Sequence, residues 1–269
     1  MRTGASAEES GRAHSPAVDR TLSVLETLVR ADSGMTLTAL SKATAIPLAT
    51  CASIAYSLER RGYASRRIVG RSHFWKATMA LYGLAVQLTR NVDLATVAQE
   101  EMQEVADALH MPVHVGVLNG ASLIYVAKAS SPGFIQFDTY PGKMLPFNLT
   151  ALGRAIAAHL PESELEPLLS GLVPGHGPKA GSADGEQFLV LLEQVRRYGY
   201  AVEDEEDEAN IGCVAVPFFD AGGHVAGAVG VTALSAVLDH ETVLAVATRL
   251  RSLAALFSDR LGDVRADAG

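Results

Sequence analysis

The chain has 269 residues, of which 48% are apolar, and its formal net charge is −8. This length suits two domains with buried cores, and no window approaches the roughly 20 apolar residues that a membrane-spanning helix needs. The start of the chain is polar, without a signal segment, and the two cysteines, Cys51 and Cys213, lie far apart. We therefore expect a reducing, cytoplasmic location.

The charges are unevenly divided along the chain. Residues 1–77 hold 11 lysines and arginines against 6 acidic residues, whereas residues 78–269 hold 11 against 24. A basic module joined to an acidic one suits nucleic-acid contact by the first part and another role for the second. The alternative interpretation is two solvated surfaces of opposite sign.

The first part of the chain is typical of a winged helix-turn-helix domain over residues 16–76, after a disordered tail at 1–15. Pro16 stands at the first position of a helix that ends near Arg30, and Thr36 can cap a second helix through residue 44. A third helix runs from Pro47 to about residue 61, where Gly62 stops it. Residues 63–76 alternate loosely, as a two-stranded wing would.

A linker helix is expected at 77–92, with an apolar stripe of Leu81, Leu84, Ala85 and Leu88 that can face a second copy of itself. The second domain spans 93–262 and begins with a helix, followed by a hairpin around Asn119-Gly120. A further strand is expected near residues 133–139. Later helices begin after Thr150 and Asp239, with strands between them, and a tail follows at 263–269. This order indicates an α+β fold with an antiparallel sheet flanked by helices, of the sensor kind.

Several motifs together resemble the IclR-type transcriptional regulators. Each motif is weak alone, but their shared order and spacing are specific, and the resemblance covers residues 18 to about 261. The motifs are Val18-Asp19-Arg20, Leu37-Thr38-Ala39-Leu40-Ser41, Leu58-Glu59-Arg60-Arg61-Gly62-Tyr63, Thr150-Ala151-Leu152-Gly153-Arg154-Ala155, and Gly199-Tyr200 through Asp204-Glu205-Glu206 to Cys213-Val214-Ala215-Val216-Pro217.

The resemblance implies an N-terminal winged helix-turn-helix domain, a linker helix and a C-terminal effector domain similar to GAF and PAS-type sensors. It further implies a homodimer or homotetramer that binds double-stranded DNA at a palindromic operator and responds to a small organic acid. Neither a cofactor nor an enzymatic activity is implied, and no metal site is expected. Repression and activation are equally compatible with these features.

The predicted DNA-binding residues fall into two groups. The outer face of the third helix is nearly uncharged. Members of the family usually have a basic or polar residue where Leu48 stands and an arginine where Ser53 stands. Base contacts are therefore expected through methyl groups, hydroxyls or DNA shape, and phosphate contacts through surrounding basic side chains. The first group is Leu48, Ala49, Thr50, Ala52, Ser53 and Tyr56, and the second is Arg20, Lys42, Arg60, Arg61, Arg66, Arg67 and Arg71.

The resemblance also implies an effector pocket. The turn at Thr150, where a helix begins, suits a carboxylate, and two phenylalanines favour an aromatic or otherwise bulky acid over one of two or three carbons. The pocket residues implied are Phe134, Phe137, Leu145, Thr150, Ala151, Leu152, Glu203, Ile211, Cys213, Gly230 and Thr232. The alternative for Phe134 and Phe137 is packing in the core.

Other polar residues receive a structural interpretation. Residues 203–208 are expected to form a solvated acidic loop with Glu203 alone turned toward the pocket, and Cys213 to be an inert buried thiol. His114 is expected to be a strand histidine with its hydrogen bonds satisfied, not a metal ligand. Two rival functions remain: an enzyme using Cys213 or Glu203, and a small-molecule-binding partner protein with weakened sequence-specific DNA binding, suggested by Leu48 and Ser53.

Overall fold

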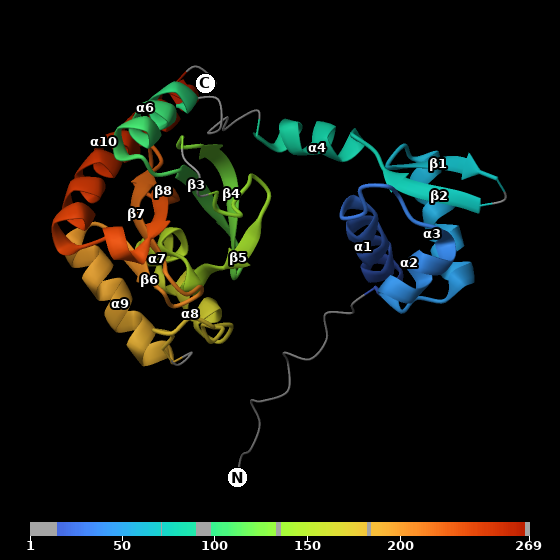
Figure 1. Cartoon of the computed structure of the whole chain (residues 1–269), viewed down its shortest axis with the longest axis horizontal. Helices are drawn as coiled ribbons and strands as arrows, with labels where there is room; N and C mark the ends of the chain where they lie inside the picture. Colours follow the sequence, from blue (N-terminus) through green and yellow to red (C-terminus); the bar gives the residue numbers. More distant parts are fainter. Residues whose placement is uncertain (1–14, 71, 90–97, 133–135, 182–183, 267–269) are drawn as a thin grey trace, which may run out of the picture. The chain divides into compact units, whose positions relative to one another are not determined.

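The computed structural model describes residues 15–70, 72–89, 98–132, 136–181 and 184–266. The chain divides into two compact units, Met1–Arg90 and Asn91–Gly269 (Figure 1). Arg71, Phe134 and the predicted start of a helix at residue 93 lie outside the described residues. Within the described part, no single helix is long and apolar enough to span a membrane. One pair of helices, Leu37–Thr44 and Leu48–Arg60, reaches the required length and composition together, but the two are bent by 111°.

The first unit is a three-helix cluster followed by a two-stranded wing. Its elements are α1 (Pro16–Val29), α2 (Leu37–Thr44), α3 (Leu48–Arg60), β1 (Ala64–Val69) and β2 (Ser72–Ala77). The predicted cap at Thr36 is present, because its hydroxyl accepts a hydrogen bond from the N–H of Ala39 at 3.2 Å. Ala45 adopts a left-handed backbone conformation that ends α2, and Pro47 precedes α3. The predicted winged helix-turn-helix is confirmed.

Trp75 is the centre of the core of the first unit. It is fully buried in β2, and its backbone pairs with Met35 in an isolated bridge. Around it pack apolar side chains from all three helices and from the turn between α2 and α3, among them Val24, Leu28, Leu40, Ile46, Cys51, Ala55 and Leu58. Trp75 therefore joins the wing to the helices. The linker helix α4 (Ala80–Thr89) follows, with Met79, Tyr82 and Leu84 exposed.

The second unit is built on one six-stranded sheet in which every adjacent pair of strands is antiparallel, in the order β5-β4-β3-β8-β7-β6. The strands are β3 (Val113–Asn119), β4 (Ser122–Ala129), β5 (Met144–Pro146), β6 (Ala201–Asp204), β7 (Ile211–Phe219) and β8 (Val225–Leu234). The helices are α6 (Gln99–Leu109), α7 (Ala151–Ala157), α8 (Glu162–Leu169), α9 (Gly185–Tyr198) and α10 (His240–Ala266), with short 3₁₀ turns at Phe147–Leu149 and Ser235–Val237.

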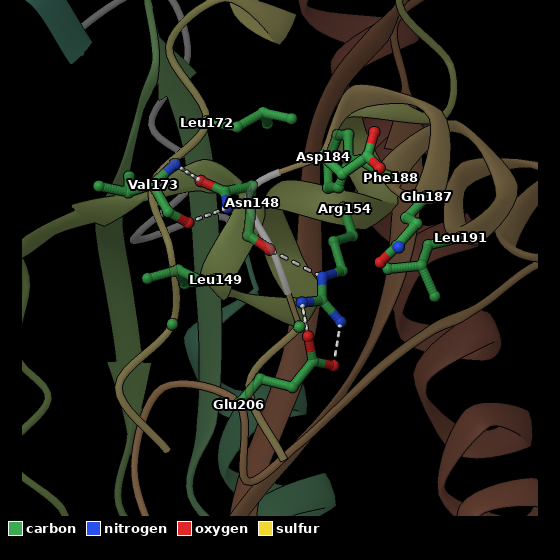
Figure 2. Close-up of a pocket in the computed structure, with 12 residues that line it drawn as sticks. Asn148, Leu149, Arg154, Leu172, Val173, Asp184, Gln187, Phe188, Leu191 and Glu206 are labelled. Atoms are coloured by element: carbon green, nitrogen blue, oxygen red, sulfur yellow. Dashed lines mark hydrogen bonds and ion pairs between the residues drawn. The ribbon is translucent and has the colours of Figure 1, made fainter. Parts of the chain in front are cut away.

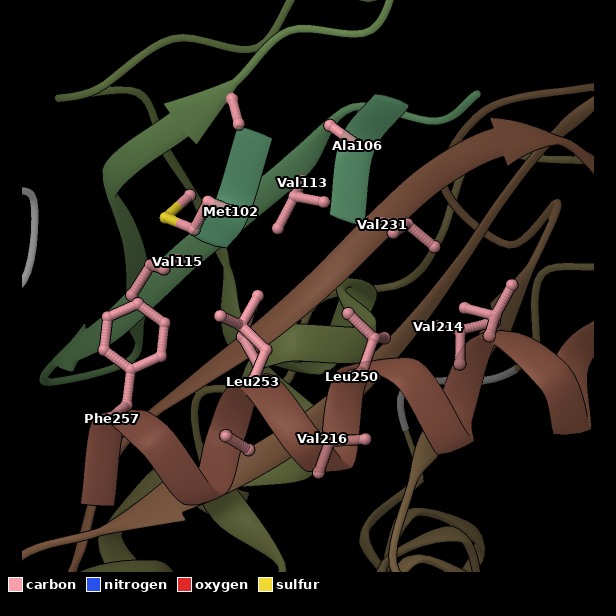
Figure 3. Close-up of a cluster of buried hydrophobic side chains, with 14 of the residues drawn as sticks. Met102, Ala106, Val113, Val115, Val214, Val216, Val231, Leu250, Leu253 and Phe257 are labelled. Atoms are coloured by element: carbon pink, nitrogen blue, oxygen red, sulfur yellow. The ribbon is translucent and has the colours of Figure 1, made fainter. Parts of the chain in front are cut away.

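Helices cover both faces of this sheet. Alternate strand residues such as Val113, Val115 and Val214 point to α6 and α10, where Leu250 and Phe257 complete one apolar core (Figure 3). The residues between them in sequence face the other way, toward α7, and a second core forms there, with Leu123, Phe147, Leu152, Ile156, Phe188 and Leu192 among its members. This three-layer α+β arrangement confirms the predicted fold class.

One predicted element is wrong. The described residues 136–139 of the strand expected near 133–139 have no strand conformation, and the short edge strand is β5 instead. β5 pairs with β4 through the register Leu123↔Leu145. Segment 136–139 contains no run of alternating apolar residues, and lysine side chains bind its backbone as described below.

Candidate DNA-binding surface and effector site

The outer face of α3 is as uncharged as the sequence indicates. Leu48 is 49% exposed and Tyr56 47% exposed, and Ala49 and Ser53 are also exposed. Thr50 and Ala52 are half-buried and belong to the flank of the helix. The helix can therefore offer methyl groups and hydroxyls to a groove, but it offers no charged side chain before its last turn.

The wing arginine Arg66 is half-buried and is bound by side chains of its own unit. Its guanidinium lies 3.4 Å from the Glu59 carboxylate and donates to the Tyr56 hydroxyl at 3.3 Å. It also stacks over the rings of Tyr56 and Trp75, at 5.3 and 5.5 Å from their centroids. These contacts explain why Tyr56, which sequence places on the outer face, leans toward the wing. Arg66 is thus less available for phosphate than its position in the sequence indicates.

The other basic residues predicted to contact DNA lie at the surface of the first unit, apart from Arg71, which is outside the described residues. Arg20 of α1 and Lys42 of α2 are exposed, as are Arg60, Arg61 and Arg67. Exposed cations of this kind bind phosphates without reading sequence. Their role as DNA contacts remains a prediction.

A cavity of about 250 Å³ lies in the second unit, on the face of the sheet that carries α7. We call it the outer chamber. Its lining combines aromatic, aliphatic and acidic side chains, namely Tyr125, Phe137, Asp138, Thr139, Lys143, Leu145, Leu149, Thr150, Glu203, Asp207, Glu208, Ile211, Cys213 and Thr232. The chamber is smaller than most cavities that hold drug-sized ligands, so it suits a compact molecule.

Most of the pocket residues expected from sequence meet here. Phe137, Leu145, Thr150, Glu203, Ile211, Cys213 and Thr232 line the outer chamber, and Ala151, Leu152 and Gly230 line a smaller space beside it. The sequence did not predict the other residues that line the outer chamber, which are Tyr125, Asp138, Thr139, Lys143, Leu149, Asp207 and Glu208. The alternation of β4, in which Tyr125 shares a face with Leu123, is a signal that could have found Tyr125.

The smaller space, which we call the inner chamber, has a volume of about 10 Å³ and shares Tyr125, Thr150, Cys213 and Thr232 with the outer one. His114 lines it and is only 1% exposed. Neither ring nitrogen of His114 has a hydrogen-bond partner among the described residues. The expectation of a satisfied strand histidine is therefore wrong, because the neighbouring strand residue, Gly230, has no side chain to offer one.

Burial determines the charge state of the side chains around these chambers. It lowers the pKa of His114 to about 3, with a smaller contribution from the positive charge of Lys128, so the imidazole is neutral. Burial also raises the pKa of the Cys213 thiol to about 12, and the charge of Glu203 adds to this. Cys213 is thus a protonated thiol and a poor nucleophile.

Glu203 is 3% exposed, and burial raises its pKa above the usual range of a carboxyl. Backbone N–H groups oppose that shift: those of Glu206 and Asp207 donate to Glu203 Oε1 at 2.7 and 3.3 Å. Its carboxyl therefore serves two purposes, to hold the following turn and to face the chamber.

The acidic run is not the solvated loop expected from sequence. Arg154 of α7, 3% exposed, donates to both carboxylate oxygens of Glu206 at 2.7 and 2.6 Å and to the carbonyl of Asn148 at 2.9 Å (Figure 2). It also donates to the carbonyl of Val202 at 3.1 Å. Six consecutive charges suggested solvation, but charge alone could not show that a buried arginine lies beneath them.

The backbone of the acidic run is also bound by the segment at residues 175–179. The N–H groups of Gly177 and Lys179 donate to the carbonyls of Glu206 and Glu205 at 2.9 and 3.1 Å. A Cβ at Gly175 or Gly177 would lie within 2.2 Å of these carbonyl oxygens, which explains the glycines. Asp207 and Glu208 consequently line the outer chamber beside Glu203.

Two lysines hold the wall formed by residues 137–139. Lys128 Nζ donates to the carbonyls of Phe137 and Thr139, at 3.4 and 2.7 Å, and Lys143 forms an ion pair with Asp138 at 3.0 Å. The Thr139 hydroxyl is buried and has no partner among the described residues. Among the described lining residues, Lys143 is the only cation.

The start of α7 is closely packed. The Thr150 hydroxyl accepts from the N–H of Gly153 at 3.0 Å, as predicted for a cap. A Cβ at Gly153 would lie 2.1 Å from the carbonyl oxygen of Phe147, so only glycine allows this approach. The described residues contain no group of three or more histidine, cysteine or acidic side chains that could hold a metal ion.

Comparison with known proteins matches both units. The IclR helix-turn-helix domain matches residues 17–67, and the bacterial transcriptional regulator IclR C-terminal domain matches residues 86–259. The HTH-type transcriptional regulator KdgR of Escherichia coli is 26% identical over 226 residues, covering 84% of this chain and 85% of KdgR.

Solved structures of similar proteins share the fold of this chain. An IclR transcriptional regulator from Alicyclobacillus acidocaldarius has a TM-score of 0.75 and 27% identity, covering 93% of this chain and 100% of its own. An IclR homolog from Microbacterium hydrocarbonoxydans, complexed with 4-hydroxybenzoate, has a TM-score of 0.77 and 23% identity, covering 91% of this chain and 98% of its own. The winged helix-turn-helix, the sheet with its α7-side chambers and the two matched domains lead to one conclusion: the chain belongs to the IclR family of transcriptional regulators.

Proposed function

We propose that this regulator senses a small aromatic acid in the outer chamber and that the acid changes its affinity for a palindromic operator bound by a homodimer or homotetramer. The observation that carries the proposal is the outer chamber itself, a compact cavity with Tyr125 and Phe137 in its wall. A benzoate-sized ring suits both its volume of about 250 Å³ and its aromatic lining.

Two further features support an aromatic acid. The homolog from Microbacterium hydrocarbonoxydans, which shares the fold, is complexed with 4-hydroxybenzoate. In this chain, Lys143 is the one cation among the described lining residues, and it can contact a carboxylate among otherwise acidic side chains. The chamber leaves much of its apolar wall unused if the ligand has only two or three carbons.

Titration of the full chain tests the effector class. Calorimetry with benzoate, 4-hydroxybenzoate, glyoxylate and pyruvate is expected to give tighter binding of the aromatic acids. Phe137→Ala should weaken the aromatic acids more than pyruvate, whereas Leu189→Ala on α9, exposed and outside the lining, should change neither. Tighter binding of the short acids would refute the proposed class.

The DNA half of the proposal has a separate test. A gel shift with the DNA upstream of the chain's own gene, at moderate salt, should show specific retardation that the bound acid alters. The acid can shift the equilibrium only by binding one DNA-binding arrangement more tightly than the other.

The uncharged outer face of α3 and the engagement of Arg66 by Glu59 favour a second candidate, a ligand-binding partner protein with weakened DNA specificity. Retardation equal on operator and random DNA would support this candidate. Specific retardation would exclude it.

A further inference from the structure

We propose that the inner chamber recognises a hydroxyl group of the effector and that His114 is the residue that binds it. This inference rests on the proposed function, because it assigns the chemistry of one end of the same ligand. It makes the effector a hydroxylated aromatic acid that enters the inner chamber with its hydroxyl and keeps its carboxylate in the outer chamber.

The first observation is an unsatisfied imidazole. His114 is 1% exposed, lines the inner chamber, and has no hydrogen-bond partner for either nitrogen among the described residues. The ring of Tyr125 meets it edge to face, with centroids 5.2 Å apart, and forms no hydrogen bond with it. A buried polar group without a partner is costly, so a ligand that supplies the missing bond gains affinity.

The second observation is the size of the space. The inner chamber, at about 10 Å³, has room for about one water-sized group. It exists because Gly230 stands opposite His114 in the register of β3 and β8. A Cβ at Gly230 would lie 2.7 Å from the carbonyl oxygen of Val214 and 3.1 Å from Leu152, so the glycine keeps the space open. A hydroxyl fits there, whereas a carboxylate with two oxygens is too large.

The third observation is the electrostatic surroundings. A neutral imidazole carries one N–H donor and one acceptor nitrogen, which matches a hydroxyl, itself donor and acceptor. Cys213 and Thr232, which join the two chambers, are also neutral, and their Sγ and Oγ1 atoms lie 3.5 Å apart.

The outer chamber completes the arrangement. It contains the buried, unpartnered hydroxyl of Thr139 and the cation Lys143, both on the side of segment 137–139. Those groups suit the carboxylate end of an acid. The ligand therefore lies with its ring between Phe137 and Tyr125 and its hydroxyl toward His114.

Calorimetry on the full chain tests the inference with acids that differ by one group: benzoate, 3-hydroxybenzoate, 4-hydroxybenzoate and 4-methylbenzoate. The wild type should bind at least one hydroxybenzoate about 3- to 10-fold more tightly than benzoate, as expected for one net hydrogen bond. The methyl compound should gain no such factor. His114→Phe should reduce the ratio to about one, and His114→Gln, which keeps a donor and an acceptor, should restore part of it.

His159→Phe is the matched control. This histidine is also part-buried with an unpartnered Nε2 and an aromatic neighbour, but it lines neither chamber. The ratio of hydroxybenzoate to benzoate affinity should be unchanged in it.

The possible outcomes distinguish the proposed effector class from the assignment of its hydroxyl to His114. If the acids bind with equal affinity, or if His114→Phe keeps the ratio, the hydroxyl assignment is overturned and the effector class stands. If none of the acids binds the wild type, the effector class fails and the hydroxyl assignment fails with it. If His114→Phe does not fold, the wild-type comparison of hydroxyl with methyl still tests recognition of the hydroxyl, and a His114→Gln variant that keeps the full wild-type ratio overturns the assignment to His114.

Discussion

Neutralising Glu206 should destabilise the second unit alone. In Glu206→Gln the guanidinium of Arg154, 3% exposed, keeps its bonds to the carbonyls of Asn148 and Val202 but loses its counter-charge. Removing one partner of a buried ion pair costs about 3–5 kcal/mol. Because Glu206 is 23% exposed and water can reach its end of the pair, we expect the lower limit, about 3 kcal/mol.

For a unit of this size, such a loss lowers the thermal midpoint by roughly 6–12 °C. Calorimetry should show this fall in the transition of the second unit. The chain has a single tryptophan, Trp75, in the core of the first unit, so the transition followed by its fluorescence should stay in place. Binding of aromatic acids should weaken as well, because Asp207 and Glu208 line the outer chamber from the same run.

Two further variants isolate the ion pair. Glu208→Gln removes a charge from the same run at an exposed position and should change the midpoint little. In an Arg154→Met background, Glu206→Gln should cost less than about 0.5 kcal/mol, since the coupling is gone. If Glu206→Gln shifts the midpoint by less than about 2 °C, or costs the same with and without Arg154, the assigned role of the pair is wrong.

Three other predictions concern charge and capping. Arg67→Gln should weaken DNA binding uniformly across sequences and reduce the slope of log affinity against log salt by about 1. Arg30→Gln, at the end of α1 and paired with Glu26, should leave that slope unchanged. Equal slopes for Arg67→Gln and the wild type would show that Arg67 makes no phosphate contact. Thr36→Ala should cost about 1 kcal/mol, measured by denaturation followed through tryptophan fluorescence, and an unchanged midpoint would discount the cap. The pKa of His114 in the folded chain, about 3, lies below its ordinary value of 6.5. Neutral His114 therefore contributes stability above pH 6.5, and this contribution is lost as the pH falls toward 3, by up to about 1.4 kcal/mol per pH unit. His114→Gln should flatten this pH dependence of the unfolding free energy in denaturation titrations, and parallel curves for variant and wild type would contradict the assignment.

The fold was largely predictable because its signals are local. Pro16, the Thr36 and Thr150 caps and the Asn119-Gly120 turn each determine the backbone within a few residues, and the structure has elements where they indicate. The strand expected near residues 133–139 failed for the opposite reason. The conformation of residues 136–139 depends on Lys128 and Lys143, whose contacts a local pattern does not contain.

The candidate site was predictable only in part. Family motifs identified Thr150, Glu203 and Cys213, and the structure places them around one cavity. Asp138 and Lys143 come from segments without a motif, and they reach the cavity only through tertiary packing. The unsatisfied state of His114 depends on the register of β3 against β8, which the sequence does not specify.

The glycine-rich segment around residues 175–179 has a consequence for how this regulator can change during evolution. This segment contacts the backbone of Glu205 and Glu206, and it provides none of the side chains that line the outer chamber. A substitution there would still displace the carboxylates that face the ligand. New ligand preferences can therefore arise from mutations in a surface segment, while the residues that touch the ligand remain unaltered.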